Sequence, residues 1–201
     1  KESEMKRSPR APFITSTLQQ TASTRLGYAP SKTMGIAQKL YEAGHITYMR
    51  TDSTTMSKQA HGQIVKVVND KYGKEYYMPR TFAKKSKMAQ EAHEAVRPSD
   101  IMKTSAGTTE DQQRLYQLIW QRTVASQMTD AKLLKMKMIV SIDGSEEIPD
   151  FTTNGSRTLF DGWFKADPDA RGEDVELPKV DVGETLKLIE MHDEAKQTQP
   201  P

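Results

Sequence analysis

Residues 44–54 read GHITYMRTDST and lie between two segments with helical periodicity. Glycine ends the helix before them, and the β-branched, threonine and tyrosine residues that follow favour a short strand or an extended turn. In extended backbone, residues i and i+2 point the same way, so Tyr48 and Arg50 are expected to project together. Thr47 and Met49 would then face the opposite side.

The pair of Tyr48 and Arg50 suits chemistry on a phosphate group. A tyrosine hydroxyl can be a covalent nucleophile, but with an ordinary pKa of about 10 it is almost fully protonated near neutral pH. It therefore needs a base or a cation nearby, and the pentavalent phosphate needs charge stabilisation. The planar guanidinium of arginine stays charged and matches phosphate oxygens. Taken alone, a Tyr-x-Arg pair is more often two surface residues.

The first half of the chain has the apolar spacing of amphipathic helices. Capping residues predict helix starts at Thr15 or Ser16, Ser31, Ser57 and Thr109, and helix ends at Gly27, Gly44 and Gly73. Gln112 is placed to close a capping box with Thr109. The inward-facing residues are expected to be Leu18, Ala22, Leu26, Met34, Ala37, Leu40, Tyr41, Ala60, Ile64, Val67, Val68, Tyr72, Leu115, Leu118, Ile119 and Met128. Such stripes are most simply the core of a helical domain.

A long irregular stretch, from about residue 76 to residue 107, separates the third and fourth of these helices. It contains Lys84, Lys85 and Lys87, a cluster that a loop usually leaves in solvent. It also contains QEAHEAVRPSD at residues 90–100. A loop of this length in a compact domain is more often functional or mobile than accidental.

After Asp130 the apolar period changes from helical to two. In LLKMKMIVSID, one face holds Leu134, Met136, Met138, Val140 and Ile142, and the other holds Lys135, Lys137 and Ser141. Turns are expected at Asp143-Gly144 and Asn154-Gly155. Further strands are expected in RTLFDGWFKA and ETLKLIEM, at residues 157–166 and 184–191. The last third is therefore predicted to be a small unit of about four strands.

Composition sets broad limits on the function. The chain has no cysteine, which excludes disulfides and thiolate metal sites within it, and no run of 18 apolar residues that would span a membrane. Residues 1–100 carry 17 basic and 9 acidic side chains, a net charge of +8, whereas residues 101–201 have a net charge of −6. A basic half permits a polyanionic partner, although an uneven, solvated surface explains it equally well. The start at Lys1 and the end in Gln-Pro-Pro suggest a piece of something longer.

Several ordered motifs carry a resemblance to a known family. GHITYMRTDS resembles the active-site segment of type IA DNA topoisomerases, and QEAHEAVRPSD resembles the family motif His-Glu-Ala-(Ile/Val)-Arg-Pro. APFITSTLQQTASTRLG resembles the segment that opens the tyrosine domain, and LYQLIWQRTVASQM the helix that closes it. LFDGWFKA resembles a strand of the arch domain. The resemblance covers nearly the whole chain, and Met49 in Tyr-Met-Arg favours the bacterial topoisomerase I branch over the topoisomerase III branch.

The resemblance implies an α+β multidomain fold. It predicts the end of a first arch-domain segment at residues 1–7, and a mainly helical, helix-turn-helix-like tyrosine domain at residues 8–134. A small antiparallel β-rich arch, or hinge, segment is predicted at residues 135–201. The resemblance also implies a monomer that acts in the cytoplasm on the nucleoid.

The resemblance gives four residues a role. Tyr48 would attack a DNA phosphodiester and become joined to the 5′ phosphate of the broken strand, while Arg50 would hold and polarise that phosphate. His93 would contact DNA near the tyrosine, although alone it is more often a surface histidine. Arg97 would contact a phosphate or serve only as a partner for Glu94 or Asp100.

The implied partners are single-stranded or underwound DNA and the remaining domains of the same enzyme, the acidic Toprim domain and the base domain. The implied cofactor is Mg²⁺, bound in the intact enzyme by the Toprim domain and not by this chain. The one Asp-x-Asp here, at Asp167 and Asp169, lies in a polar stretch and is interpreted as a turn. The implied reaction is relaxation of negative supercoils without ATP, because one phosphodiester is exchanged for another.

Two other functions are also compatible with the sequence. The helices and strands could form a helix-turn-helix-type DNA-binding module without catalysis. Such a module would tolerate Tyr48→Phe in every assay, whereas the enzyme would lose cleavage and keep binding. A purely structural interaction domain would bind no DNA in a salt-dependent way.

Overall fold

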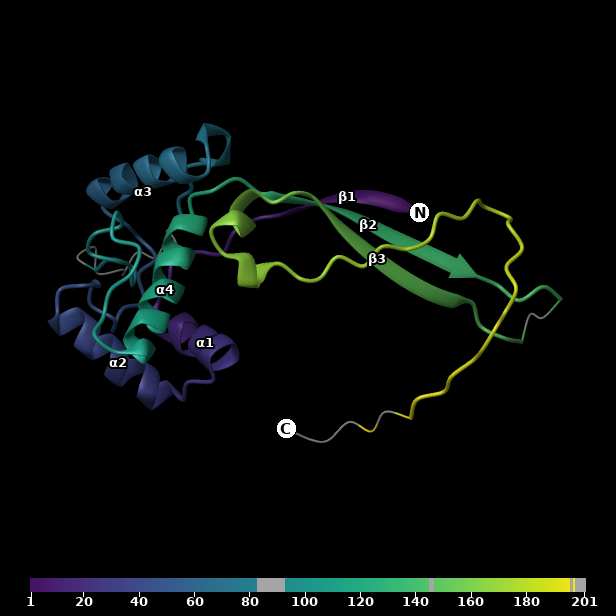
Figure 1. Ribbon diagram of the computed structural model, residues 1–201, viewed down its shortest axis with the longest axis horizontal. Helices are drawn as coiled ribbons and strands as arrows, with labels where there is room; N and C mark the ends of the chain where they lie inside the picture. Colours follow the sequence, from purple (N-terminus) through teal and green to yellow (C-terminus); the bar gives the residue numbers. More distant parts are fainter. Residues whose placement is uncertain (83–92, 145–146, 196, 198–201) are drawn as a thin grey trace, which may run out of the picture.

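The structure is a computed structural model that describes residues 1–82, 93–144, 147–195 and 197. Four α-helices gather at one end of the molecule, and a three-stranded antiparallel ribbon extends from them (Figure 1). The α-helices are α1 (Thr15–Leu26), α2 (Pro30–Glu42), α3 (Lys58–Lys71) and α4 (Glu110–Ala125); the strands are β1 (Glu2–Arg7), β2 (Ala131–Val140) and β3 (Phe151–Phe160); short 3₁₀ turns are η1 (Lys74–Tyr76), η2 (Gly162–Lys165) and η3 (Pro168–Ala170). The expected α+β class, with a helical part and a small antiparallel sheet, is confirmed.

The expected ends of the first two helices are partly right. Helix α1 ends at Gly27, whose φ of 69° is the left-handed conformation that favours glycine. Its N-cap is Ile14, one residue before the expected cap, because Thr15 uses its hydroxyl on another segment. The prediction that Ser31 caps α2 is wrong, since Pro30 already occupies the first helical position, where its fixed φ and missing N–H are tolerated.

The caps of the other two helices lie where they were expected. The Ser57 hydroxyl accepts a hydrogen bond from the Ala60 N–H at the start of α3, and the Thr109 hydroxyl accepts one from the Gln112 N–H at the start of α4. The capping box at Thr109 does not close as expected. The Gln112 side chain instead accepts from the Thr108 N–H, 2.8 Å away and one residue earlier.

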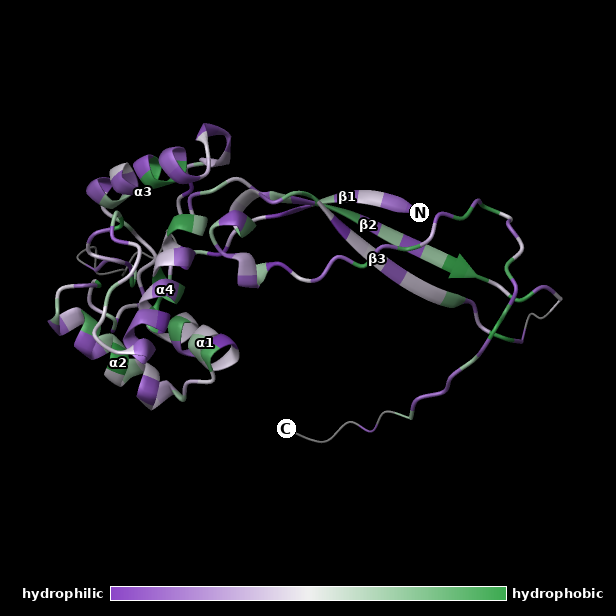
Figure 2. Ribbon diagram, in the orientation of Figure 1, coloured by the Kyte–Doolittle hydropathy of each residue, from purple (hydrophilic) through white to green (hydrophobic). Residues whose placement is uncertain are grey.

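The helical end has one continuous core. Most of the apolar stripes face inward, and Figure 2 shows the corresponding hydrophobic bands on the helices. The largest fully buried apolar side chains are Tyr116, Phe13, Leu18, Leu40, Ile46, Met49, Ile64, Ile101, Leu115, Ile119 and Met128. The expectation that Tyr41 faces inward is wrong, because its side chain is exposed. The segment that follows α2 thus contributes Ile46 and Met49 to the core, which fixes its path.

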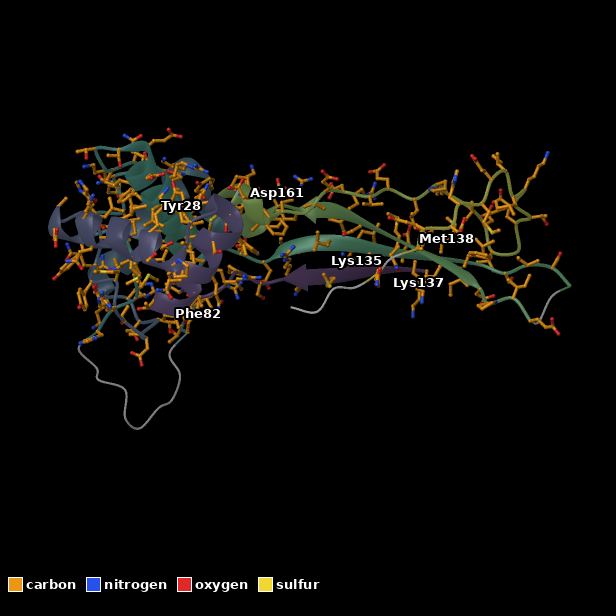
Figure 3. All side chains as sticks on the ribbon, turned by 90° about the horizontal axis from the view of Figure 1, so that it is seen from below. Tyr28, Phe82, Lys135, Lys137, Met138 and Asp161 are labelled. Atoms are coloured by element: carbon orange, nitrogen blue, oxygen red, sulfur yellow. The ribbon has the colours of Figure 1, made fainter. Side chains whose placement is uncertain are left out.

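The ribbon places β2 between β1 and β3. Strand β1 pairs with β2 from Glu2↔Met136 to Arg7↔Ala131, a strand that the sequence pattern did not predict. Along β2 the exposure alternates as expected: Met136 and Met138 are half-buried, whereas Lys135 and Lys137 are exposed (Figure 3).

Two expected features of the last third are wrong, and a third is only partly right. Asn154-Gly155 is not a turn but lies inside β3, where Gly155 pairs with Met136. A Cβ on Gly155 would lie 2.7 Å from the Val175 carbonyl oxygen, so the glycine allows a crossing segment to approach the strand closely. The stretch ETLKLIEM has no strand partner in the described structure and stays irregular. Within RTLFDGWFKA, only the part before Asp161 is strand.

The base of the ribbon is fixed to the helical end by η2. The Trp163 indole N–H donates to the Arg7 carbonyl of β1 at 2.8 Å, while its backbone N–H donates to the Thr129 carbonyl, just after α4, at 3.0 Å. Beside it, the Phe160 ring of β3 stacks on Tyr76 with centroids 5.1 Å apart. Gly162 has a φ of 52°, and a Cβ there would collide with the Asp130 carbonyl oxygen. Only glycine therefore fits at the point where the ribbon returns to the helices.

The buried Tyr116 makes stability depend on alkaline pH. Burial, with a smaller contribution from Asp100, raises the pKa of Tyr116 to about 12, and its hydroxyl donates to the Lys103 carbonyl at 2.6 Å. A group with a raised folded-state pKa stabilises fully below its unfolded value of about 10 and loses that contribution as pH rises toward the folded value. As pH rises from 9 to 11, the free energy of unfolding should fall in the unchanged chain. In Tyr116→Phe we expect this fall to be smaller by about 1 kcal/mol. Urea unfolding at the two pH values measures this, and equal losses would contradict it.

Candidate active-site segment and nucleic-acid interface

One side of the Tyr48 segment is held by the stretch that contains the His-Glu-Ala-Val-Arg-Pro motif. The Thr47 N–H donates to the Arg97 carbonyl at 2.9 Å, and the Thr47 hydroxyl donates to the Ala95 carbonyl at 2.6 Å while accepting from the Arg97 N–H. An isolated bridge joins Ile46 to Pro98. These bonds tie two stretches about fifty residues apart in the sequence to one another directly beside Tyr48.

The other side is held by the first turn of α1. The Thr15 hydroxyl lies 2.8 Å from the Met49 carbonyl and 3.0 Å from the Thr51 carbonyl, and it accepts from the Thr51 N–H at 2.9 Å. The Thr15 backbone N–H also donates to the Thr51 carbonyl. Tyr48 is therefore carried by a backbone that is hydrogen-bonded on both sides, which restricts where its side chain can go.

The exposure of consecutive residues follows the expected alternation. Met49 is fully buried, whereas Tyr48 is 43% exposed and Arg50 is exposed. Thr47 is half-buried and spends its hydroxyl on the hydrogen bonds described above. The backbone is extended at the Ile46 bridge and bends at residues 49–50, so it is an extended turn rather than a strand.

Tyr48 has one aromatic neighbour. The Tyr41 ring, at the end of α2, meets it edge-on with centroids 5.2 Å apart and an interplanar angle of 63°. Within the residues that the structure describes, the Tyr48 hydroxyl makes no hydrogen bond and Arg50 makes no ion pair. Both side chains are exposed at the surface of the described structure.

Arg97 is tied to other protein groups. Its guanidinium forms an ion pair with Glu94 and donates to the Pro98 carbonyl at 2.8 Å. Glu94 in turn accepts from the Ser57 N–H at 2.6 Å, at the start of α3, where a carboxylate is favoured by the helix dipole. Of the two roles left open for Arg97, the structure provides the partnership with Glu94. A phosphate contact by Arg97 stays a prediction.

His93 is exposed and lies at the edge of the described residues. The sequence motif places it three residues before Val96, which bridges to Phe13 in front of α1. It thus lies on the stretch that holds Tyr48, as a DNA-contacting residue would need to. The lysines Lys84, Lys85 and Lys87 lie outside the described residues.

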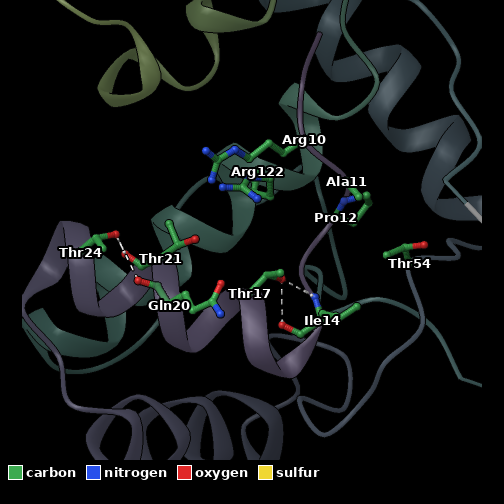
Figure 4. A pocket seen from close by; sticks show the side chains of 10 residues that line it. All are labelled: Arg10, Ala11, Pro12, Ile14, Thr17, Gln20, Thr21, Thr24, Thr54 and Arg122. Carbon is green, nitrogen blue, oxygen red and sulfur yellow. Dashed lines mark hydrogen bonds between the residues drawn. The ribbon is translucent and has the colours of Figure 1, made fainter. Parts of the chain in front are cut away.

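The structure adds a groove beside the Tyr48 segment that the sequence did not reveal. It has a volume of about 320 Å³ and opens between the strand-like residues 10–14, α1 and α4 (Figure 4). Its lining residues are Arg10, Ala11, Pro12, Ile14, Thr17, Gln20, Thr21, Thr24, Thr54 and Arg122. In the sequence, Arg122 stands among the apolar residues of α4. Only the structure, which places it beside Arg10, shows that it belongs to a polar site.

Among the described residues, no three acidic or histidine side chains gather in a way that would hold a metal ion. The Asp-x-Asp sequence does not provide such a site. Asp167 is 1% exposed and accepts two hydrogen bonds from Arg25, at 2.6 and 3.3 Å, at the start of η3. The interpretation of this sequence as a turn is confirmed. In the same described part, no helix is long and apolar enough to cross a membrane.

Comparison with known proteins agrees with the geometry. A family model described as DNA topoisomerase matches residues 1–201. The chain is 48% identical over 200 residues to DNA topoisomerase 1 of Escherichia coli, a match that covers 96% of this chain and 22% of that protein. It is 46% identical over 199 residues to DNA topoisomerase 1 of Pseudomonas aeruginosa, with the same coverage. The solved structure of full-length topoisomerase I from Thermotoga maritima matches with a TM-score of 0.75 and 33% identity, covering 90% of this chain and 30% of that one.

The chain belongs to the DNA topoisomerase family. Its relatives are bacterial topoisomerases I, which form part of the type IA branch. The chain spans about a fifth of the length of these curated relatives. The domain boundaries expected at residues 7/8 and 134/135 stay predictions.

Proposed function

We propose that this chain supplies the nucleophile of an ATP-independent type IA DNA topoisomerase that relaxes negative supercoils. The observation that carries the proposal is the arrangement at Tyr48. An exposed tyrosine, whose hydroxyl makes no hydrogen bond with a described residue, lies two residues before an exposed arginine, on a backbone held on both sides by Thr15 and Thr47. Preorganised positioning of this kind is what transfer of a phosphoryl group requires.

The reaction exchanges one phosphodiester for another. The Tyr48 hydroxyl oxygen forms a bond to the phosphorus of one DNA linkage, and the bond from phosphorus to the 3′ oxygen of the preceding nucleotide breaks. The tyrosine proton leaves, the 3′ oxygen takes up a proton, and the 5′ side of the break is joined to Tyr48. Attack by the free 3′ hydroxyl reverses the step and rejoins the strand, so no ATP is consumed.

The remaining site residues have separate tasks in this proposal. The Arg50 guanidinium, a planar donor fork that stays charged, holds the scissile phosphate and stabilises its developing charge. His93 contacts a neighbouring phosphate. Arg97 acts chiefly by positioning, because its ion pair with Glu94 fixes the backbone that Thr47 binds.

Other parts of the intact enzyme complete the proposal. The Toprim domain, which the family resemblance links to Mg²⁺, would supply the metal ion. The ribbon would belong to an arch that moves the Tyr48 region away from the Toprim and base domains, so that a strand can pass. The substrate would be single-stranded or underwound DNA. The enzyme would act as a monomer, in the cytoplasm on the nucleoid.

The isolated chain is expected to bind single-stranded DNA without cleaving it. Exposed cations near Tyr48 attract phosphates, and this attraction weakens as salt rises. We expect no covalent protein–DNA product from the 201-residue chain in Mg²⁺, as judged by denaturing electrophoresis with a labelled oligonucleotide. Robust Mg²⁺-dependent cleavage by the chain alone would contradict the assignment of the metal site to another domain.

The proposed activity is tested on a longer protein in which this chain is joined to the Toprim and base domains. We expect it to relax negatively supercoiled plasmid in Mg²⁺ without ATP. The matched control is the same protein with Tyr48→Phe. Equal relaxation by both proteins would refute the assignment of Tyr48 as nucleophile.

A further inference from the structure

Arg122 is a largely buried cation that contacts an aromatic ring and forms no ion pair with a described residue. Its side chain is 5% exposed, on α4, and its guanidinium lies 4.3 Å from the centre of the Phe13 ring. It makes no hydrogen bond or ion pair with any described residue. The nearby Asp167 is already occupied, because both of its oxygens accept from Arg25. None of its five N–H donors has an acceptor among the described residues, and the guanidinium nitrogens retain some contact with solvent.

The Arg122 guanidinium lies on the wall of the groove described above. Figure 4 shows Arg122 beside Arg10 along one side, with Gln20 and Thr21 of α1 facing them across the opening. The hydroxyl groups of Thr17, Thr24 and Thr54 donate to backbone carbonyls within the protein. The donors that face a ligand are therefore the two guanidinium groups, with the Gln20 amide and the Thr21 hydroxyl across the opening.

The electrostatics of the groove favour an anion. Burial is the main cause that lowers the pKa of Arg122 to about 10, and the like charges of Arg25 and Arg10 act in the same direction, against the attraction of Asp167. A buried charge left unpaired is unfavourable, and a bound anion would remove that penalty. An arginine pair matches the oxygens of a phosphate in particular, because the planar fork can donate two parallel hydrogen bonds.

We propose that this groove is a second phosphate-binding subsite, which holds a backbone phosphate of the same single DNA strand that Tyr48 attacks. The inference rests on the proposed function and extends it. Thr54 lines the groove and follows Tyr48 by only six residues, so at most about 21 Å of extended chain separates the two sites. A strand can therefore contact both within a few nucleotides, which would fix its register at the nucleophile.

The test compares two arginines of the same helix in the 201-residue chain. Arg122→Met removes the charge and its cation–π contact but keeps an apolar side chain beside Phe13, and Arg114→Met removes an exposed charge of α4 outside the groove. Binding of labelled oligothymidylate is measured by fluorescence anisotropy over a range of salt concentrations. We expect Arg122→Met to weaken binding about tenfold and to lower the salt slope by about 0.7, the value for one phosphate of a single strand. Arg114→Met should change neither.

Stability separates binding from a structural role. Removing a buried, unpaired charge should leave the urea midpoint of Arg122→Met unchanged or higher, whereas a purely structural arginine would lower it. Unchanged oligonucleotide binding by Arg122→Met would overturn the subsite while leaving the role of Tyr48 intact. The subsite would equally be overturned if the variant lost affinity for a polyglutamate peptide instead of DNA. Absence of salt-dependent DNA binding by the unchanged chain would overturn the subsite together with the proposed DNA contacts.

Discussion

Tyr48→Phe is expected to reduce formation of the covalent protein–DNA adduct by at least about a thousandfold, in a protein that joins this chain to the Toprim domain. The substitution removes only the hydroxyl oxygen that would bond to phosphorus. This hydroxyl makes no hydrogen bond with a described residue, and the ring is 43% exposed, so the fold should change by less than about 0.5 kcal/mol. Denaturing electrophoresis with a labelled single-stranded oligonucleotide measures the adduct.

The matched control for this prediction is Tyr41→Phe. Tyr41 is 40% exposed and contacts the Tyr48 ring edge-on, so it loses the same atom in nearly the same place. We expect adduct formation by Tyr41→Phe to remain, and oligonucleotide binding by both variants to match that of the unchanged protein. Full adduct formation by Tyr48→Phe would show that another residue is the nucleophile.

Thr15→Val is expected to destabilise the fold by about 2–4 kcal/mol and to slow cleavage by about 10–100-fold. Valine keeps the shape of threonine but removes the hydroxyl that bonds the Met49 carbonyl and the Thr51 N–H. Both backbone groups would lose their partner next to a buried core. The Tyr48 backbone would then move, and small displacements of a reacting group carry large penalties in rate. Urea unfolding and single-turnover cleavage measure the two effects.

Ser16→Ala provides the control for Thr15→Val. Ser16 is the next residue of α1, it is exposed, and its hydroxyl makes no hydrogen bond with a described residue. We expect the free energy of unfolding of Ser16→Ala to stay within about 0.5 kcal/mol of that of the unchanged protein. Its cleavage rate should not change. Normal stability together with normal cleavage in Thr15→Val would mean that the clamp on the Tyr48 segment is not required.

Much of the helical part was predictable because its signals are local. Ser57 and Thr109 begin helices where capping rules place them, and Gly27 ends one with a positive φ. The exposure of Tyr48 beside a buried Met49 also followed from extended backbone. In these cases a few neighbouring residues determine the conformation, so the sequence carries the information directly.

The features that the sequence did not predict depend on partners far along the chain. Strand β1 forms because β2, more than a hundred residues later, offers it an edge. Gly155 looked like a turn residue, yet its role is to admit the crossing segment at Val175. Arg122 received no role from the sequence, and only its neighbours from other elements place its charge beside Arg10 in the groove. Pattern rules cannot supply such long-range contacts.

The role of Tyr48 as nucleophile is tested best by identifying the chemical link between protein and DNA, in a protein that joins this chain to the Toprim domain. Oligonucleotides labelled at either the 5′ or the 3′ end are cleaved, the adduct is digested with a protease, and the modified peptide is identified by mass spectrometry. We predict that the peptide containing Tyr48 carries the nucleotide and that only the 3′ label stays with the protein, as a 5′-phosphotyrosine requires. A nucleotide on any other peptide, or retention of the 5′ label, would contradict the account.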